Sequence, residues 1–586
     1  MPWALAALSS TSLLAACRPL QQPLGSLTPS VVGSGGTAGT AGKPDAGTPD
    51  AAPRSDAGPP TLTGTQIPDI PPEWNGCDPT GVNVVRCYQD PKVPSSPPPP
   101  GLFSGTADPD PTRKPVLVYP LAGSMQPINL ADITFQWRRA PDVAQTIFRI
   151  RLSRINGDIF EFFVPCNHTN AAVDAECVYH LPPGAWLDLA QTGRGEQLVV
   201  DVTGVDPKRV GSVAPSDPTA ISFTPEYVSG GFYYWSTSIT GTMRLLFGGR
   251  THQPFVVPKT ASNPATCSGC HAVSHSGSTI AFTEGDTAAG VLSVAETTNV
   301  DKPNFTPATM HDSGTMALNS DGSRVIVSTA GRLFLRDAHT GAQILEVPPA
   351  DLGQPIHGFH PDWSPDDKSI ALTLSAMGAS DWSVSTGAIG VLPYNNGAFG
   401  PVETLVDTGT DFNFYPTWSP DGHWIAFATA PVGVSMGVAE TSYRQTKARL
   451  RLVNRDTHAV FELAAATGGV GRTSTWPKFA PGVQAGGLMF LTYNSRIDYG
   501  FYLSNNTNEM TGQTQLWMTT IDVRKLQTAA SDPSSPPVWL PFQAVTERNY
   551  LGVWAEHIGC RVENGQSIGC GDHEICDKGA CAMVTQ

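Results

Sequence analysis

The sequence predicts a mainly β chain, and three observations support that prediction. Its 586 residues include 58 Gly and 53 Pro, which favour turns and disfavour long helices. Between residues 113 and 226, apolar and polar residues alternate with period two, as they do in half-buried strands. Between residues 227 and 557, a turn motif recurs at intervals that suit one small sheet per copy. We therefore expect two β regions in series.

Residues 1–17 form a short apolar segment that ends in Leu14-Ala15-Ala16-Cys17. This ending resembles the lipobox of bacterial lipoproteins, in which the cysteine carries lipid after cleavage. The resemblance implies that Cys17 is lipidated and anchors the chain to a membrane. Localisation would then be the cell envelope: the outer membrane, the periplasm or the cell surface.

Residues 18–112 are rich in Gly, Ala and Pro and contain little that could be buried, so we expect a disordered tether. A small element around Cys77 and Cys87 interrupts it. In residues 113–226, Ile133, Phe135 and Trp137 alternate with polar residues. This region resembles a fibronectin III or immunoglobulin-like β-sandwich.

The repeat in residues 227–557 is clearest in the segments 418–427 and 363–372, which share Trp-Ser-Pro-Asp. Proline presets φ in this turn, and a following glycine takes a positive φ, while aspartate bonds to the backbone that follows it. We interpret the turn aspartates as structural. The triplet after the turn, Ile-Ala-Phe in two copies, is expected to be the inner strand of each sheet.

These repeats resemble the β-propeller repeats of TolB and related exported proteins. The resemblance implies a TolB-like propeller, which we expect to have six blades, with five or seven left open. Residues 232–236 and 243–247 look like two outer strands without an inner partner. Residues 550–554 could supply that partner and close the ring.

The motif Cys267-Ser268-Gly269-Cys270-His271 has the C-x-x-C-H spacing of covalent haem attachment. It resembles a group of exported TolB-like propellers that carry C-x-x-C-H at this junction. The resemblance implies haem c, with thioethers at Cys267 and Cys270 and His271 as the proximal iron ligand. The distal ligand is left open among the loop residues His252, Met310, His311, His357 and His360, or an empty sixth position. A Cys267–Cys270 disulfide and a zinc site remain alternatives.

The other cysteines indicate an oxidising compartment, where disulfides persist. Proximity suggests the pairs Cys77–Cys87 and Cys166–Cys177. Residues 558–586 form a tail with four further cysteines, for which we expect two disulfides, with zinc as the alternative: Cys560, Cys570, Cys576 and Cys581.

Two functional hypotheses follow. In the first, the haem transfers electrons to or from a protein redox or Tol-like partner. In the alternative, the propeller is a non-redox protein-binding platform. A net charge of −15 argues against nucleic acid as a partner. Residues 433–437 fit G-x-S-x-G, but no hydrolase domain follows them, so we set hydrolysis aside.

Overall fold

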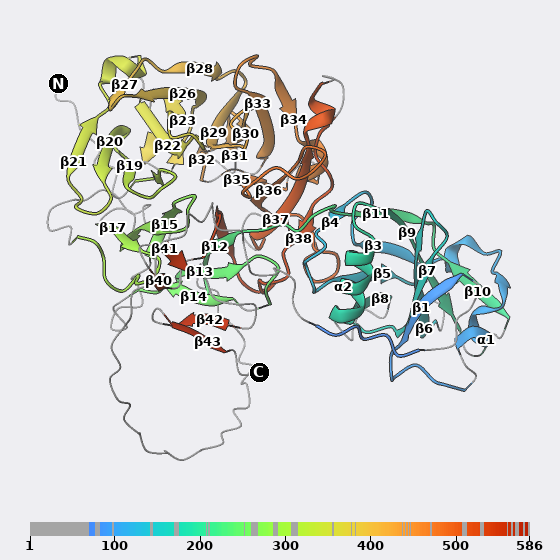
Figure 1. Cartoon of the computed structure of the whole chain (residues 1–586). Coiled ribbons are helices and arrows are strands. Elements are labelled where there is room, and N and C mark those ends of the chain that lie inside the picture. The colour runs from blue at the N-terminus through green and yellow to red at the C-terminus, as the bar shows by residue number, and fades with distance from the viewer. Residues whose placement is uncertain are drawn as a thin grey trace, which may run out of the picture.

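The structure is a computed structural model (Figure 1). It describes residues 70–76, 83–96, 99–140, 145–168, 175–206, 208, 211–250, 252–258, 268–284, 291–305, 314–353, 357–376, 378–380, 383–435, 438–439, 441–443, 445, 447–468, 472–504, 506, 512–527, 532–558, 561–563, 566–568, 574–577 and 580–583. The predicted leader and most of the tether lie outside these residues, and so does Cys17. No helix in the described part of the chain is long and apolar enough to cross a membrane.

The N-terminal part contains a large mixed sheet, ordered β1-β7-β6-β9-β10-β2, with β11 beside β9 and β4 beside β11. Its strands are β1 (Val84–Gln89), β2 (Thr106–Ala107), β4 (Met125–Gln126), β6 (Ile147–Arg154), β7 (Ile159–Pro165), β9 (Gln197–Val205), β10 (Ser212–Pro215) and β11 (Thr219–Phe223). Helix α1 (Pro99–Phe103) lies between β1 and β2, and the 3-10 helix η1 (Pro111–Arg113) follows β2. The prediction of a disordered tether is therefore wrong from residue 84 onward, because β1 and β2 pair in this sheet and α1 packs in its core.

A second, three-stranded sheet packs against the first and has the order β3-β5-β8. Its strands are β3 (Val116–Tyr119), β5 (Thr134–Arg138) and β8 (Glu176–His180), and helix α2 (Pro183–Thr192) follows. Phe135 and Trp137 of β5 join Phe148 of β6 and Trp186 of α2 in one core. The predicted apolar face of β5 is therefore correct, but the strand is not half-buried, because Thr134 and Gln136 on its other face are buried too. The fibronectin III or immunoglobulin-like classification stays a prediction.

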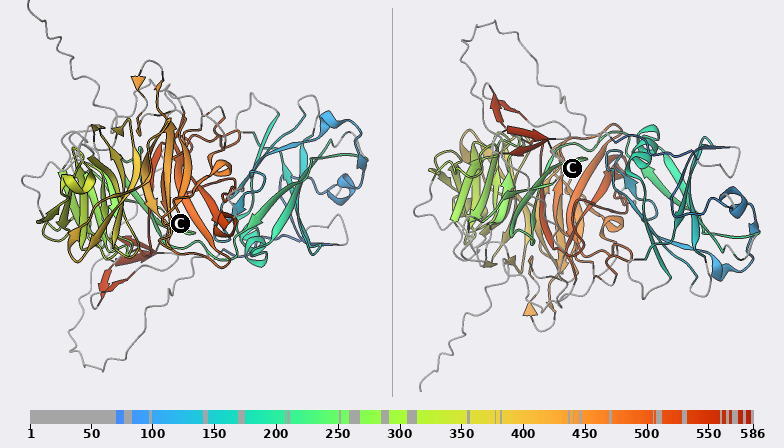
Figure 2. Two further views of the ribbon diagram at one scale, coloured as in Figure 1. Left: turned by 90° about the horizontal axis from the view of Figure 1, so that it is seen from above. Right: turned by 90° about the horizontal axis from the view of Figure 1, so that it is seen from below.

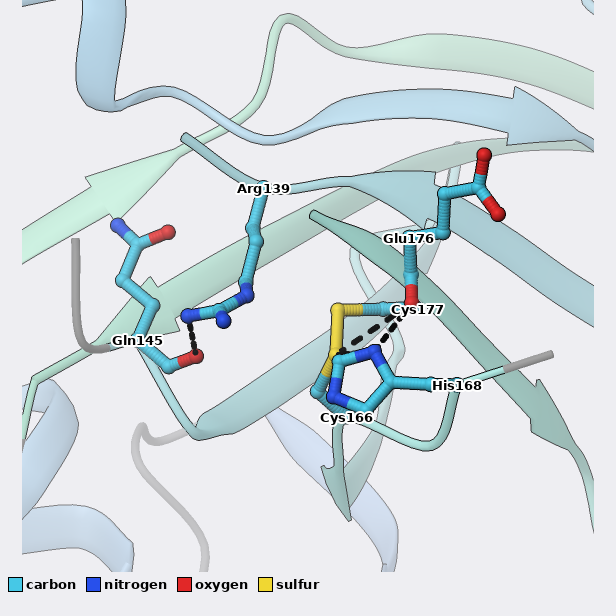
Figure 3. The surroundings of a disulfide bond; sticks show 6 residues. All are labelled: Arg139, Gln145, Cys166, His168, Glu176 and Cys177. Carbon is cyan, nitrogen blue, oxygen red and sulfur yellow. Dashed lines mark hydrogen bonds between the residues drawn. A yellow bond between two sulfur atoms is a disulfide. The ribbon is translucent and has the colours of Figure 1, made fainter. Parts of the chain in front are cut away.

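A disulfide joins the end of β7 to β8, between Cys166 and Cys177 (Figure 3). This pairing confirms the prediction from proximity. Beside it, the His168 Nδ1 lies 2.7 Å from the carbonyl oxygen of Glu176. Cys87 is also disulfide-bonded, and its predicted partner Cys77 lies outside the described residues.

The larger part of the chain is a six-bladed β-propeller, as predicted (Figure 1). Blade 1 contains β39 (Asn549–Ala555), β12 (Gly231–Ser236), β13 (Gly241–Leu246) and β14 (Gln253–Val256). Blade 2 contains β15 (Ser268–Val273), β16 (Thr279–Glu284) and β17 (Val291–Glu296). Blade 3 contains β18 (Met316–Leu318), β19 (Arg324–Thr329), β20 (Arg332–Asp337) and β21 (Gln343–Glu346), and η2 (Pro349–Leu352) follows it.

Blade 4 contains β22 (His357–Trp363), β23 (Ser369–Ser375), β26 (Ala388–Asn395), β27 (Ala398–Phe399) and β28 (Glu403–Val406). Blade 5 contains β29 (Asp411–Trp418), β30 (Trp424–Pro431), β33 (Arg449–Asn454) and β34 (Val460–Glu462), and α3 (Ala464–Thr467) follows it. Blade 6 contains β35 (Thr475–Phe479), β36 (Leu488–Ser495), β37 (Gln515–Asp522) and β38 (Val538–Trp539), with η3 (Val523–Gln527) between β37 and β38. Two small hairpins are inserted, β24 (Gly378–Ser380) with β25 (Ser383–Val384) and β31 (Val434–Ser435) with β32 (Val438–Ala439).

The two ends of the propeller sequence share blade 1. Strand β39 pairs antiparallel with β12, and Phe232 is the register partner of Trp554. The predicted closure by residues 550–554 is therefore confirmed. Consecutive inner strands contact each other around the ring, and β15 contacts β39 to complete it. Closure in this way leaves no gap between the first and last blades.

One prediction about the blades is wrong. The Ile-Ala-Phe triplets 280–282 and 425–427 lie in β16 and β30, the second strands of their blades, whereas the inner strand precedes the turn. The physical reason is burial. Second strands are covered on both faces and are continuously apolar, whereas inner strands line the ring centre and carry polar and irregular segments. The apolar signal therefore marks the second strand.

The N-terminal sheets dock on blade 6 through aromatic and amide contacts. The ring of Tyr499, in the loop after β36, stacks on Trp539 at 4.1 Å and meets Tyr119 edge-on at 5.0 Å. The main-chain N–H of Trp539 donates to the Tyr119 hydroxyl at 3.1 Å. Gln136 Oε1 accepts from the Phe501 N–H at 2.7 Å. Because these contacts are buried and directional, they fix the sheets against the propeller.

The C-terminal tail leaves blade 1 at the end of β39. Two hairpins follow, β40 (Arg561–Glu563) with β41 (Gln566–Ile568) and β42 (Glu574–Asp577) with β43 (Ala580–Met583). Figure 2 shows them on the face of the ring opposite to the β31–β32 hairpin. Cys576 and Cys581 are register partners in β42 and β43, whereas Cys560 and Cys570 lie outside the described residues. The predicted tail disulfides and their zinc alternative stay predictions.

Candidate functional site

The six inner strands surround a cavity of about 110 Å³ at the centre of the ring. In each blade the lining begins at one residue: Leu551, Cys270, Thr315 (directly before β18), His360, Tyr415 and Trp476. From these residues the lining continues toward the ends of the inner strands, where the blade turns begin. We call the side of the ring that carries these turns, at residues 277, 322, 367, 422 and 482, the turn face.

The lining residues sit at irregularities in the inner strands. The register of β22 against β23 shifts between Phe359 and Asp362, and equivalent shifts occur in β15, β29 and β35. His360, Tyr415 and Trp476 have φ values of 51°, 53° and 53°, and Leu551 has 51°. Such conformations cost about 1–3 kcal/mol each for residues other than glycine, and they concentrate at functional sites. At these bulges the backbone directs the large side chains of His360, Tyr415 and Trp476 toward the central cavity.

Three of these side chains form a ring stack, made of His360, Tyr415 and Trp476 from blades 4, 5 and 6. The Tyr415 and Trp476 centroids lie 3.7 Å apart with 21° between the planes. The His360 and Tyr415 centroids lie 4.2 Å apart with 50° between the planes. His360 Nδ1 lies 2.9 Å from the Thr373 hydroxyl. The ring stack lies at the inner end of the cavity.

An ion pair spans the cavity above the ring stack. The Lys478 ammonium of blade 6 bonds to Asp362 Oδ1 of blade 4, past the inner strand of blade 5. The Trp418 N–H of blade 5 donates to Asp362 Oδ2 at 2.9 Å. Both charged side chains remain in part accessible, with 22% of Lys478 and 15% of Asp362 exposed. The cavity therefore combines an aromatic end with a single pair of opposite charges.

Two ionisable groups of the cavity are neutral at physiological pH. Burial raises the pKa of Tyr415 well above its ordinary value, against the effect of a hydrogen bond to Ser442 and together with the nearby Cys270. Burial also lowers the pKa of His271 to about 4, against a smaller effect of the Tyr233 main chain. Of the described residues that line the cavity, Asp362 and Lys478 are the carboxylate and the ammonium.

The structure brings part of the predicted haem site together. Cys270 and His271 lie in β15, and both line the same cavity as His360. Of the other proposed distal ligands, the described residues His357 and His252 do not line it: His357 is the first residue of β22, at the far end from the turn, and His252 precedes the outer strand β14. The prediction that His357 and His360 lie in loops is wrong, because both belong to the inner strand β22. Cys267, Met310 and His311 lie outside the described residues.

The described residues do not fit a covalently attached haem. Cys270 packs against the core between blades 2 and 3. His271 is paired with Phe282, which belongs to the core between blades 1 and 2, and it lies near the Tyr233 main chain. The two side chains thus project to opposite faces of one sheet, whereas a thioether and an axial ligand must meet one porphyrin. His271 is also only 3% exposed. A cavity of roughly 150 Å³ holds one benzene ring, and a porphyrin is several times larger.

Tyr415, Trp476, Asp362 and Lys478 are not among the site residues that the sequence predicts. A signal for them was present, because a ring precedes proline in three repeats, in His360-Pro361, Tyr415-Pro416 and Trp476-Pro477. Each pair stands just before the repeat's Trp or Phe. A bulky ring at one fixed offset from a structural turn indicates a position that faces the ring centre in successive blades.

The G-x-S-x-G segment has no hydrolase context in the described residues. Its Ser435 ends β31, which pairs with β32 in a hairpin between β30 and β33 of blade 5. A nucleophile elbow requires a strand followed by a helix within a parallel sheet. Ser435 therefore does not stand at a strand-to-helix elbow.

Fold and cavity together define a six-bladed β-propeller with a pocket at the turn face of its channel. Solved structures similar to this chain include TolB from Acinetobacter baumannii, at 14% identity and a TM-score of 0.37, which covers 62% of this chain and 80% of that chain. BamB from Moraxella catarrhalis is also similar, at 14% identity and a TM-score of 0.22, over 43% of this chain and 69% of that chain. A nidogen/laminin complex matches at 10% identity and a TM-score of 0.33, over 56% and 98%. No family model and no curated protein sequence matches the chain.

Proposed function

We propose that this protein is an exported binding protein whose propeller holds a protein partner at the turn face, over the central cavity. The observation that carries this proposal is the pocket itself, which all six blades line and which the ring stack bounds at its inner end. A partner would enter from the turns. The residues that bound the pocket offer stacking surface and one ion pair, which suit recognition of a side chain.

Hydrogen bonds between neighbouring turns support a preformed binding surface. The Glu556 N–H donates to the His275 carbonyl at 2.7 Å, and the Ser276 N–H donates to the Ser320 carbonyl at 3.0 Å. The Ser320 N–H donates to Asp367 Oδ1 at 2.8 Å. These bonds tie blades 1 to 4 together at the turn face. A surface that is rigid before binding loses less entropy when the partner docks.

The disulfides support an exported location. Cys166–Cys177 and the bonded Cys87 would not persist in a reducing cytoplasm. Lipidation of Cys17, with residues 18–69 as a tether, would place the propeller at a membrane of the cell envelope. A Tol-like envelope protein is the partner class that the sequence resemblance suggests.

Electron transfer through haem c is the other hypothesis from the sequence. It needs Cys270 and His271 to act on one porphyrin, and their opposite orientation in β15 disfavours that arrangement. The binding hypothesis requires no rearrangement of the inner strands. We therefore place binding first.

A photo-crosslinking experiment in cells tests the proposal. A photoreactive amino acid would replace Asp421 on the turn face or, as the matched control, Val432, which is 50% exposed in the loop after β30 on the opposite face. We expect a discrete protein adduct from position 421 and little from position 432. Equal adducts from both positions, or adducts from position 432 alone, would contradict a turn-face site.

A further inference from the structure

The size of the cavity limits what can enter it. At about 110 Å³ it is smaller than the roughly 300–1,000 Å³ pockets that hold drug-sized ligands. It is large enough for the end of one side chain, and its lining runs from the ring stack toward the turns. The occupant therefore arrives from the turn face as a single projecting group.

The turns around the pocket mouth carry an excess of negative charge. The described turn segments 274–278, 319–324, 364–368, 419–423, 480–487 and 556–558 contain five acidic residues and two basic residues. The acidic residues are Asp321, Asp366, Asp367, Asp421 and Glu556, and the basic residues are Arg324 and Lys368. An acidic rim around a small cavity raises the local concentration of cations. The favoured occupant is positively charged.

Within the pocket, Asp362 is the fixed member of the ion pair and Lys478 is the movable one. Asp362 is held by the Trp418 N–H at 2.9 Å on the oxygen that Lys478 does not use. Lys478 carries its ammonium on a flexible four-carbon chain and is 22% exposed, so it can swing toward solvent. A second cation could then take its place on Asp362, beside the rings of Tyr415 and Trp476.

Building on the proposed function, we propose that the partner inserts a cationic side chain, an ammonium or guanidinium, which displaces Lys478 and pairs with Asp362. The internal lysine acts as a placeholder that keeps the carboxylate paired while the pocket is empty. The partner class is therefore a basic peptide segment. Partner selection would rest on the acidic rim for attraction and on the ring stack for fit.

Calorimetric titration of the full chain with trilysine tests this, with triglutamate as the probe of opposite charge. Asp362→Asn should weaken trilysine binding at least tenfold, because it removes the fixed carboxylate. Lys478→Met should strengthen binding about tenfold, because the competing cation is gone. Asp217→Asn removes the same charge from an exposed carboxylate of the N-terminal part, 85% exposed, and should leave binding unchanged.

The opposite signs of the two pocket variants separate this mechanism from misfolding, which would weaken both. Trilysine affinity that is unchanged in both the Asp362→Asn and the Lys478→Met variant would overturn the inference. Tighter binding of triglutamate than of trilysine, or no binding of trilysine, would overturn it too. If any of these results occurs together with a partner adduct at position 421, the proposal of protein binding at the turn face is retained and only the cationic side chain is rejected. If position 421 gives no adduct, the proposed binding function is rejected.

Discussion

At the residue scale, His271 shows how a fold changes the meaning of a motif. Its spacing from Cys270 indicates a haem ligand, but in β15 its imidazole is 97% buried between two blades and stays neutral. Sequence could place the motif before a blade turn, as the structure confirms. It could not show that consecutive residues of an inner strand face different cores, because that depends on the neighbouring blades.

The low pKa of His271 predicts acid sensitivity. An unfolded histidine titrates near 6.5, and the pKa of folded His271 is about 4, so the unfolded chain binds the extra proton first. The stabilisation that neutral His271 contributes is therefore fully present near pH 7 and is lost as the pH drops from about 6.5 toward 4. Chemical denaturation at pH 7 and pH 4.5 should show that the free energy of unfolding falls by about 2 kcal/mol less in His271→Leu than in the wild type. His339→Gln, at a side chain that is 56% exposed, is the control.

The orientation of Cys270 and His271 predicts the outcome of a haem stain. We expect protein produced in a host competent for cytochrome maturation to carry no covalent haem after denaturation. The double variant Cys267→Ala with Cys270→Ala would then have the same visible spectrum as the wild type. Haem that survives denaturation and is lost in this variant would mean that β15 rearranges, and would favour the electron-transfer hypothesis.

At the element scale, the repeat predicted the blades but not which strand is innermost. The turns could be predicted from sequence because a positive φ favours glycine, and Gly277, Gly322, Gly422 and Gly482 all have positive φ. The inner strand was misplaced because its bulges and polar residues interrupt the apolar pattern. The ring stack was missed for the same reason.

The turn glycines should matter through backbone conformation alone. Gly422 has a φ of +73°, and an added Cβ would meet nothing within 4 Å, so Gly422→Ala tests conformation without a clash. We expect a loss of about 1–2 kcal/mol in the free energy of unfolding. Gly409→Ala also points into open space but lacks a positive φ. That variant should be neutral or slightly stabilising, and equal losses at both sites would contradict the account.

At the scale of the whole molecule, closure through β39 and docking of the N-terminal sheets produce one unit. The sequence predicted the closure, since residues 232–236 and 243–247 lacked an inner partner, but nothing in it indicated the Tyr119, Tyr499 and Trp539 contact. That contact joins segments far apart in the chain. Its residues carry no shared motif.

This interface predicts coupled unfolding. We expect calorimetry of the wild type to show one main transition, because Tyr499 packs on both parts of the molecule. Tyr499→Ala should lower stability by about 3 kcal/mol, as for a large buried ring, and separate the transition into two. Two well-resolved transitions in the wild type would show that the parts fold independently.

The central claim is that the channel pocket, and not the turn face in general, holds the partner. The most direct measurement is the yield of the photo-crosslinked adduct from position 421 when the ring stack is altered. Trp476→Phe keeps a ring beside Tyr415 and should retain most of the adduct, whereas Trp476→Ala should reduce it at least tenfold while the unfolding transition persists. An undiminished adduct in a folded Trp476→Ala protein would contradict the claim.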